Sequence, residues 1–148
     1  MDVIIYYYID MNNNKRYKKM AKLNTSKIGT IGELIGSAWL AAKGYTVHRN
    51  TEPNGPIDLI AEKDGMVLFI DVKVMAGRMN GTAKNGYGSK SASREDVSIL
   101  YVHLGQMRCR FKGTKEKPIA IWTSIKDELQ ASAKDELVTF LDAVYSDK

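Results

Sequence analysis

A length of 148 residues, an apolar share of 44% and a net charge of +5 describe one ordinary globular domain. No apolar run approaches the ~20 residues of a membrane-spanning helix, so we expect no membrane partner. The single cysteine, Cys109, excludes an internal disulfide, and no Cys or His cluster suggests zinc. A reducing, cytoplasmic setting fits (the host-cell cytoplasm if the protein is viral), and the pI of about 9.2 favours a polyanionic partner.

The first 26 residues divide into an apolar stretch and a basic stretch. Residues 1–10 are rich in isoleucine and tyrosine, which favours a β-strand; they lack the basic start and small-residue cleavage site of a signal peptide. Residues 11–27 are polar and basic, which is typical of a flexible arm or linker. We therefore expect an N-terminal strand and basic arm over residues 1–26, and the main domain over residues 27–148.

A helix and three strands are expected next. Residues 28–43 carry apolar side chains at helical spacing, and Gly44 follows as a stop. Residues 45–49, 57–61 and 66–74 have the composition of short strands. Asp64 and Gly65 separate the last two apolar runs, which is a strong hairpin signal.

The C-terminal half begins with residues 76–94, a stretch rich in Gly, Ser, Asn and Lys that indicates a mobile basic loop. Residues 99–104 and 107–112 predict a strand pair, and residues 119–125 a further strand. Apolar residues at helical spacing then mark a closing amphipathic helix: Leu137, Phe140, Leu141 and Val144. Together these elements predict an α/β fold.

Three charged residues interrupt the apolar strands: Asp58, Asp71 and Lys73. Because side chains alternate along a strand, Asp71 and Lys73 point to one face and their apolar neighbours to the other. Charges on neighbouring apolar strands are costly unless they pair with one another or hold a metal ion. Two nearby carboxylates repel, a divalent cation relieves that repulsion, and all-oxygen coordination suits magnesium.

These residue types fit metal-assisted phosphodiester hydrolysis. Asp58 and Asp71 would place an ion that activates water and polarises the phosphate. Lys73 would orient the attacking water and stabilise the charge of the transition state, and Glu33 on the preceding helix could reach the same cluster. The alternative for Asp71 and Lys73 alone is an ion pair on a solvated strand face. A helix with an acid, followed by strands with an Asp and an Asp-x-Lys, is a more specific pattern.

Four segments in this order resemble the PD-(D/E)xK nuclease superfamily, and within it the archaeal-type Holliday junction resolvases. They are residues 32–34 (Gly-Glu-Leu), 44–49, 57–61 (Ile-Asp-Leu-Ile-Ala) and 70–74 (Ile-Asp-Val-Lys-Val). Residues 55–61 are also similar to a bacterial family of small resolvase-like proteins. The resemblance covers residues 27–74. Ile57 stands where Pro is usual, Asp71 where Glu is commoner, and the similarity fades after Lys73.

The resemblance implies a restriction-endonuclease-like core, with a central mixed β-sheet flanked by helices, that cleaves DNA with Mg²⁺ (Mn²⁺ as substitute). It implies a nuclease domain over residues 27–148 and, as an expectation, a homodimer. It gives Asp58, Asp71 and the backbone carbonyl of Val72 as metal ligands. Lys73 would be catalytic, and Glu33 would support the metal ion, either directly or through a water molecule.

Basic residues outside this cluster are the candidates for contacts with DNA phosphates. Residues 108–112 alternate basic and apolar side chains, which predicts one basic strand face; the alternative is a solvated or edge strand whose charges oppose aggregation. The expected DNA-binding residues are Arg49, Arg78, Lys84, Lys90, Arg94, Arg108, Arg110 and Lys112.

Three functions remain open at this point. A structure-selective resolvase is favoured by the small size and by the absence of a recognisable base-reading domain. A sequence-specific endonuclease of homing or restriction type is favoured by the unmatched C-terminal half and the basic loop. A catalytically inactive DNA-binding module of the same fold would need the loss of a charged position, and all four are present.

Overall fold

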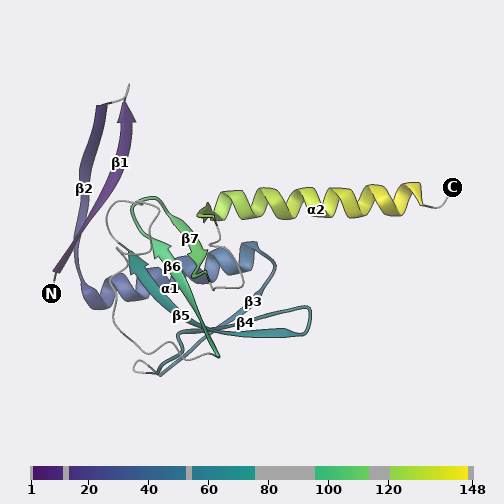
Figure 1. Ribbon diagram of the computed structural model, residues 1–148, viewed down its shortest axis with the longest axis horizontal. Coiled ribbons are helices and arrows are strands. Elements are labelled where there is room, and N and C mark those ends of the chain that lie inside the picture. Colours follow the sequence, from purple (N-terminus) through teal and green to yellow (C-terminus); the bar gives the residue numbers. More distant parts are fainter. Residues whose placement is uncertain (1, 12–13, 53–54, 76–95, 114–120, 147–148) are drawn as a thin grey trace.

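A computed structural model describes residues 2–11, 14–52, 55–75, 96–113 and 121–146, and for residues 2–21 the backbone alone. The described chain forms a two-stranded hairpin, a six-stranded sheet and two helices (Figure 1). The six strands lie in the order β3-β4-β5-β6-β7-β8, with β5 and β6 parallel and the other neighbours antiparallel. The prediction of an α/β fold with a central mixed sheet is therefore confirmed.

The N-terminal segment is a β-hairpin. Strand β1 (Asp2–Met11) confirms the expected first strand, and it pairs antiparallel with β2 (Asn14–Asn24). The linker interpretation of residues 11–27 is wrong for β2, because the backbone of this basic stretch pairs with the apolar strand before it. In Figure 1 the hairpin extends away from the large sheet.

Helix α1 (Thr25–Ala42) covers one face of the large sheet and begins three residues earlier than expected. The earlier start has a local cause, because Asn24 caps the helix by accepting a hydrogen bond from the Lys27 N–H. Two glycines one turn apart let α1 approach closely. A Cβ on Gly32 would overlap Val74 of β5, and one on Gly36 would lie 3.0 Å from Cδ2 of Leu100.

Strands β3 (Thr46–Arg49), β4 (Leu59–Lys63) and β5 (Met66–Met75) confirm the three expected strands with small shifts of their ends. The hairpin between β4 and β5 turns at Asp64 and Gly65, both with positive φ, as the Asp-Gly signal predicts. Asp58 does not lie within β4 as expected but immediately before it. The core forms between this sheet and α1, and its fully buried side chains include Leu40, Leu59 and Ile70.

The C-terminal half contains β6 (Val97–His103), β7 (Arg108–Phe111), β8 (Thr123–Ser124) and α2 (Ile125–Tyr145). The strand expected over residues 119–125 is reduced to β8, with residues 119 and 120 outside the described chain. The cause is a capping box, in which Ser124 and Asp127 exchange hydrogen bonds and start the helix.

Helix α2 confirms the amphipathic helix expected at the end of the chain. None of its residues is buried, and after its first two turns it projects away from the sheet (Figure 1). Neither helix of the described part combines the length and the apolar composition that a membrane crossing requires. The basic loop expected at residues 76–94 lies outside the described residues.

Candidate active site

The two aspartates meet where the β4–β5 ladder ends. The last paired residues are Leu59 and Ile70, and Asp58 lies directly outside this ladder, close enough to the Asp71 carboxylate for that charge to raise its pKa. Two hydrogen bonds hold Asp58 there: its backbone N–H donates to the Ile70 carbonyl at 2.9 Å, and its Oδ2 accepts from the Val72 N–H at 2.7 Å. The carboxylates predicted from sequence are therefore a cross-strand pair.

The environment of Asp58 disfavours its charged form. The pKa of Asp58 is raised to about 6, chiefly by burial and also by the nearby Asp71 and Glu33 carboxylates, while the hydrogen bond from the Val72 N–H acts in the opposite direction. Two carboxylates held this close to one another repel when both are charged. The fold thus maintains an unfavourable acidic pair at this position, which is a feature of functional sites more often than of structural ones.

Lys73 lies on the same strand face as Asp71, as the alternation predicts. Its Nζ is 3.0 Å from Oδ2 of Asp71, and both side chains remain partly accessible. Ile70 points to the other face, where it is fully buried, and Val72 and Val74 pack against the same core. The apolar half of β5 therefore anchors the strand while the charged half stays available to a ligand.

Glu33 and Arg49 complete the cluster from α1 and β3. Nη2 of Arg49 donates to Oε2 of Glu33 at 3.1 Å, and Glu33 is close enough to contribute to the raised pKa of Asp58. The structure thus brings together all four residues named as catalytic and adds Arg49 as a direct partner of one of them. The site contains three acids and two bases.

The donor set fits an ion that needs few protein ligands. Within the described residues, no group of three or more His, Cys, Asp or Glu side chains is arranged to hold a metal. The pair of Asp58 and Asp71 remains, and magnesium typically takes one or two carboxylates and keeps several waters. Glu33, which is tied to Arg49, fits the water-mediated role better than direct ligation.

The basic face of β7 is smaller than expected. Arg108 and Lys112 are exposed, but Arg110 is only 4% exposed and does not present a phosphate contact at the surface. Its guanidinium carbon lies 5.1 Å from the Tyr101 ring centre and 4.9 Å from that of Trp122, so cation–π contacts take the place of solvent. Arg78, Lys84, Lys90 and Arg94 lie outside the described residues.

Two residues near the site were not singled out from the sequence. Tyr101 pairs in register with Lys73 across β5 and β6, which no sequence signal indicates because the pairing depends on the order of strands. Asn50 fixes the segment before Asp58: its Nδ2 donates to the Ile57 carbonyl at 2.8 Å, and its Oδ1 accepts from the Glu52 N–H. An Asn before a turn containing Pro and Gly was an available signal.

Comparison with known proteins gives relatives along much of the chain. A UPF0102 protein of Symbiobacterium thermophilum is 40% identical over 98 residues, which are 62% of this chain and 83% of that protein. A UPF0102 protein of Maricaulis maris is 42% identical over 86 residues, covering 51% and 68% respectively. No protein-family model matches the chain. Among solved structures, a bacterial homing endonuclease has a TM-score of 0.49 and 12% identity, over 78% of this chain and 98% of that one.

Proposed function

The chain belongs to the UPF0102 family, and we propose that it is a magnesium-dependent endonuclease that hydrolyses phosphodiester bonds in DNA. The observation that carries this proposal is the cross-strand pair of Asp58 and Asp71 with Lys73 on the same strand face. A pair of acids maintained against its own repulsion, beside a cation, suits a site that receives a metal ion and a phosphate.

Each residue has a role that follows from its position. Asp58 and Asp71 would hold the ion, and the Val72 carbonyl would face it, because the Val72 N–H already points to Asp58 and both groups of one extended residue point to the same side. A bound magnesium ion would polarise the phosphate and lower the pKa of a bound water. Lys73 would leave Asp71 to orient the attacking water and to stabilise the charge of the transition state. Glu33 would orient water at the ion.

Exposed basic residues supply the contacts that hold the DNA backbone. Arg49 borders the acidic cluster, and Arg108 and Lys112 are exposed on and beside β7. Each would neutralise a phosphate and make binding weaker at high salt. Arg78, Lys84, Lys90 and Arg94 remain proposed contacts on the same charge argument.

The substrate that we propose is branched DNA of the four-way junction type, on the motif likeness of residues 27–74 to the resolvases. A sequence-specific endonuclease of homing or restriction type is the second candidate, and an inactive DNA-binding module is the third. The convergence of Glu33, Asp58, Asp71 and Lys73 at one place supports an active enzyme over an inactive module. Two symmetric cuts would need a dimer.

The test is cleavage of labelled four-way junctions and of linear duplexes of many sequences, with magnesium or manganese and with EDTA. We expect metal-dependent cutting of the junction by the wild type, loss of cutting in Lys73→Ala, and full activity in Lys126→Ala, an exposed lysine on α2. Cutting of particular duplexes alone would favour the sequence-specific candidate. Cleavage that persists in EDTA and in Lys73→Ala would show that the site is wrong.

A further inference from the structure

Helix α2 carries a large apolar surface that the described chain leaves exposed. Its big apolar side chains are between 41% and 64% exposed: Leu129, Leu137, Val138, Phe140, Leu141, Val144 and Tyr145. Single exposed apolar residues are common, but a contiguous group of this size marks an interaction surface. The feature lies away from the acidic cluster, so it goes beyond the proposed nuclease activity.

Four apolar residues of α2 lie along one line of the helix, and Val138, Leu141 and Tyr145 lie to one side of it. Ala133, Leu137, Phe140 and Val144 follow one another at intervals of four, three and four residues, which is the a/d spacing of a coiled coil. We call these four residues the apolar stripe. At about 100° per residue, Asp135 and Asp142 fall on the opposite side of the helix. The stripe itself contains no charge.

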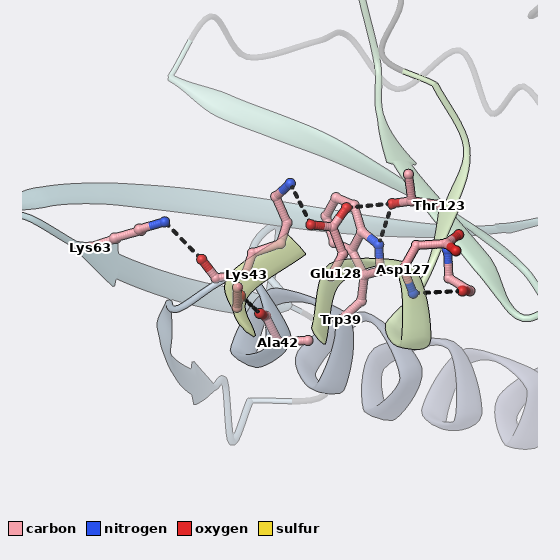
Figure 2. A network of polar contacts seen from close by, with 9 residues as sticks. Trp39, Ala42, Lys43, Lys63, Thr123, Asp127 and Glu128 are labelled. Carbon is pink, nitrogen blue, oxygen red and sulfur yellow. Dashed lines mark hydrogen bonds and ion pairs between the residues drawn. The ribbon is translucent and has the colours of Figure 1, made fainter. Parts of the chain in front are cut away.

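The polar side of α2, and not the stripe, attaches the helix to the rest of the molecule. Glu128 forms an ion pair with Lys43 of α1 at 3.3 Å and accepts a hydrogen bond of 2.6 Å from Thr123 (Figure 2). Trp39 donates to the same Thr123 oxygen at 3.0 Å, and Ser132 donates to the Ala42 carbonyl at 2.7 Å. Helix α2 is thus fixed by its first two turns.

This attachment decides which way the stripe faces. Glu128 and Ser132 are one turn apart and share their side of the helix with Asp135, so the stripe points away from α1. To bury the stripe on α1, the helix would have to rotate by roughly 130° and break the contacts of Glu128 and Ser132. The stripe is therefore placed for a separate molecule.

We propose that the stripe binds the stripe of a second copy of this chain, with the two α2 helices antiparallel about a two-fold axis. In this register Leu137 packs beside the partner's Phe140, and Ala133 beside the partner's Val144, so a small residue meets a branched one at each end. Residues 133–145 lie beyond the attachment to α1 and give a contact about 20 Å long. Antiparallel pairing places the two sheet domains at opposite ends, whereas parallel pairing would bring them to the same end.

The charges of α2 disfavour a nucleic acid as the partner of the stripe and permit a second copy. Residues 125–145 contain five acidic and two basic side chains, a net charge of −3, whereas the whole chain has +5, so the remainder carries +8. A polyanion is repelled by such a helix and attracted by the remainder. In the antiparallel pair Asp135 and Asp142 point outward on both helices, and Glu136 beside the stripe lies next to Ala143 of the partner subunit in this register. The molecule thus separates a basic part for a polyanion from an acidic helix for association.

The first test measures molar mass by light scattering or sedimentation between about 1 and 100 μM, a range typical for weak to moderate association. We expect wild type to reach twice the chain mass of 16.6 kDa. Leu137→Glu should weaken the dimer by at least about 100-fold, because two uncompensated charges enter the contact. Thr139→Glu adds the same charge on the outward side and should leave the dimer unchanged. Circular dichroism of each variant shows whether the helix is retained.

The second test fixes the orientation of the helices. Chains carrying Leu137→Cys are mixed with chains carrying Phe140→Cys and oxidised; the native Cys109 is fully buried and does not compete. Antiparallel pairing predicts disulfides mainly between the two different variants, whereas parallel pairing gives each variant linked to itself. A monomeric wild type at 100 μM would overturn the proposal and assign the stripe to another protein. A dimer that withstands Leu137→Glu would place the interface elsewhere and overturn it equally.

Discussion

The two helices of this protein use their apolar residues in opposite ways. Helix α1 buries seven residues against the sheet, two of them glycines that admit the strands to close contact, whereas α2 buries none. Around α1 the chain gains stability and positions Glu33 beside Asp58. Along α2 only Ile125, at its start, packs against the core, and the exposed apolar side chains from Leu129 onward support no part of it. Helical periodicity therefore predicts that a helix has an apolar face, but it does not predict whether that face packs against the same chain or against another one.

The largest effect is expected when a carboxylate is removed from the proposed active site on the sheet, in comparison with a carboxylate removed from α2. Asp71→Asn should lower cleavage by about 100-fold or more, because one of the two proposed ligands of the ion is lost while the side-chain volume is kept. Asp142→Asn on α2 is the matched control and should cleave as wild type does. Calorimetric titration with manganese should show weaker binding for Asp71→Asn alone. Equal activity of both variants would remove β5 from the active site.

The close contact between α1 and β5 is tested by a single methyl group. Gly32→Ala should destabilise the protein by roughly 1–3 kcal/mol, because its Cβ would overlap Val74 and force α1 or β5 to move. Gly29→Ala lies on the same helix with nothing within 4 Å, so it should stabilise by about 0.5–1 kcal/mol through helix propensity. Urea denaturation of both variants gives the two values. The same sign for both would mean that α1 is not packed as described.

The raised pKa of Asp58 predicts that its charged carboxylate lowers the stability of the fold, although the proposed DNA cleavage requires it. The folded-state pKa of about 6 exceeds the ordinary value of 3.8, so the folded protein holds this proton more tightly than the unfolded chain. The stabilising contribution is complete below pH 3.8 and is lost as the pH rises through about 6. Asp58→Asn should therefore melt a few degrees higher than wild type at pH 8, and the advantage should vanish near pH 4.

The matched control for this effect is Asp135→Asn, an exposed residue of α2, which should melt as wild type does at both pH values. Asp58→Asn should also fail to cleave DNA, since it retains the hydrogen bond from the Val72 N–H but loses the charge. A lower melting temperature at pH 8 would show that Asp58 stabilises the fold as a carboxylate, contrary to its burial.

The smallest effect on stability is expected at the exposed apolar residues of α2. Phe140→Ser should change the unfolding free energy of the monomer by less than about 0.5 kcal/mol, because the Phe140 side chain is 63% exposed and supports no core. The measurement is urea denaturation at a concentration below that of dimer formation. At higher concentration the same variant should be the less stable one, since it loses the association energy. A large loss in the dilute monomer would mean that α2 packs on its own chain.

Part of the candidate site follows from local pattern alone. The alternation along β5 places Asp71 and Lys73 on one face and Ile70 on the other, and the distance of 3.0 Å between the two charged groups agrees with it. The proximity of Asp58 to Asp71, however, depends on the register of β4 and β5. The Asp64-Gly65 turn predicts that the two strands form a hairpin, but it does not fix this register. The pairing of Arg49 with Glu33 depends on how α1 crosses the sheet, which neither segment encodes by itself.

Helix α1, strands β3 to β6, the Asp-Gly turn and the charged residues of the site could be predicted from sequence, because they depend on periodicity and on local backbone preference. The pairing of β2 with β1, the burial of Arg110 between Tyr101 and Trp122 and the outward direction of α2 became known from the three-dimensional arrangement alone. These outcomes depend on which surfaces meet across long stretches of chain. An apolar face or a basic side chain is the same in sequence whether it finds its partner in the core, in another chain or in solvent.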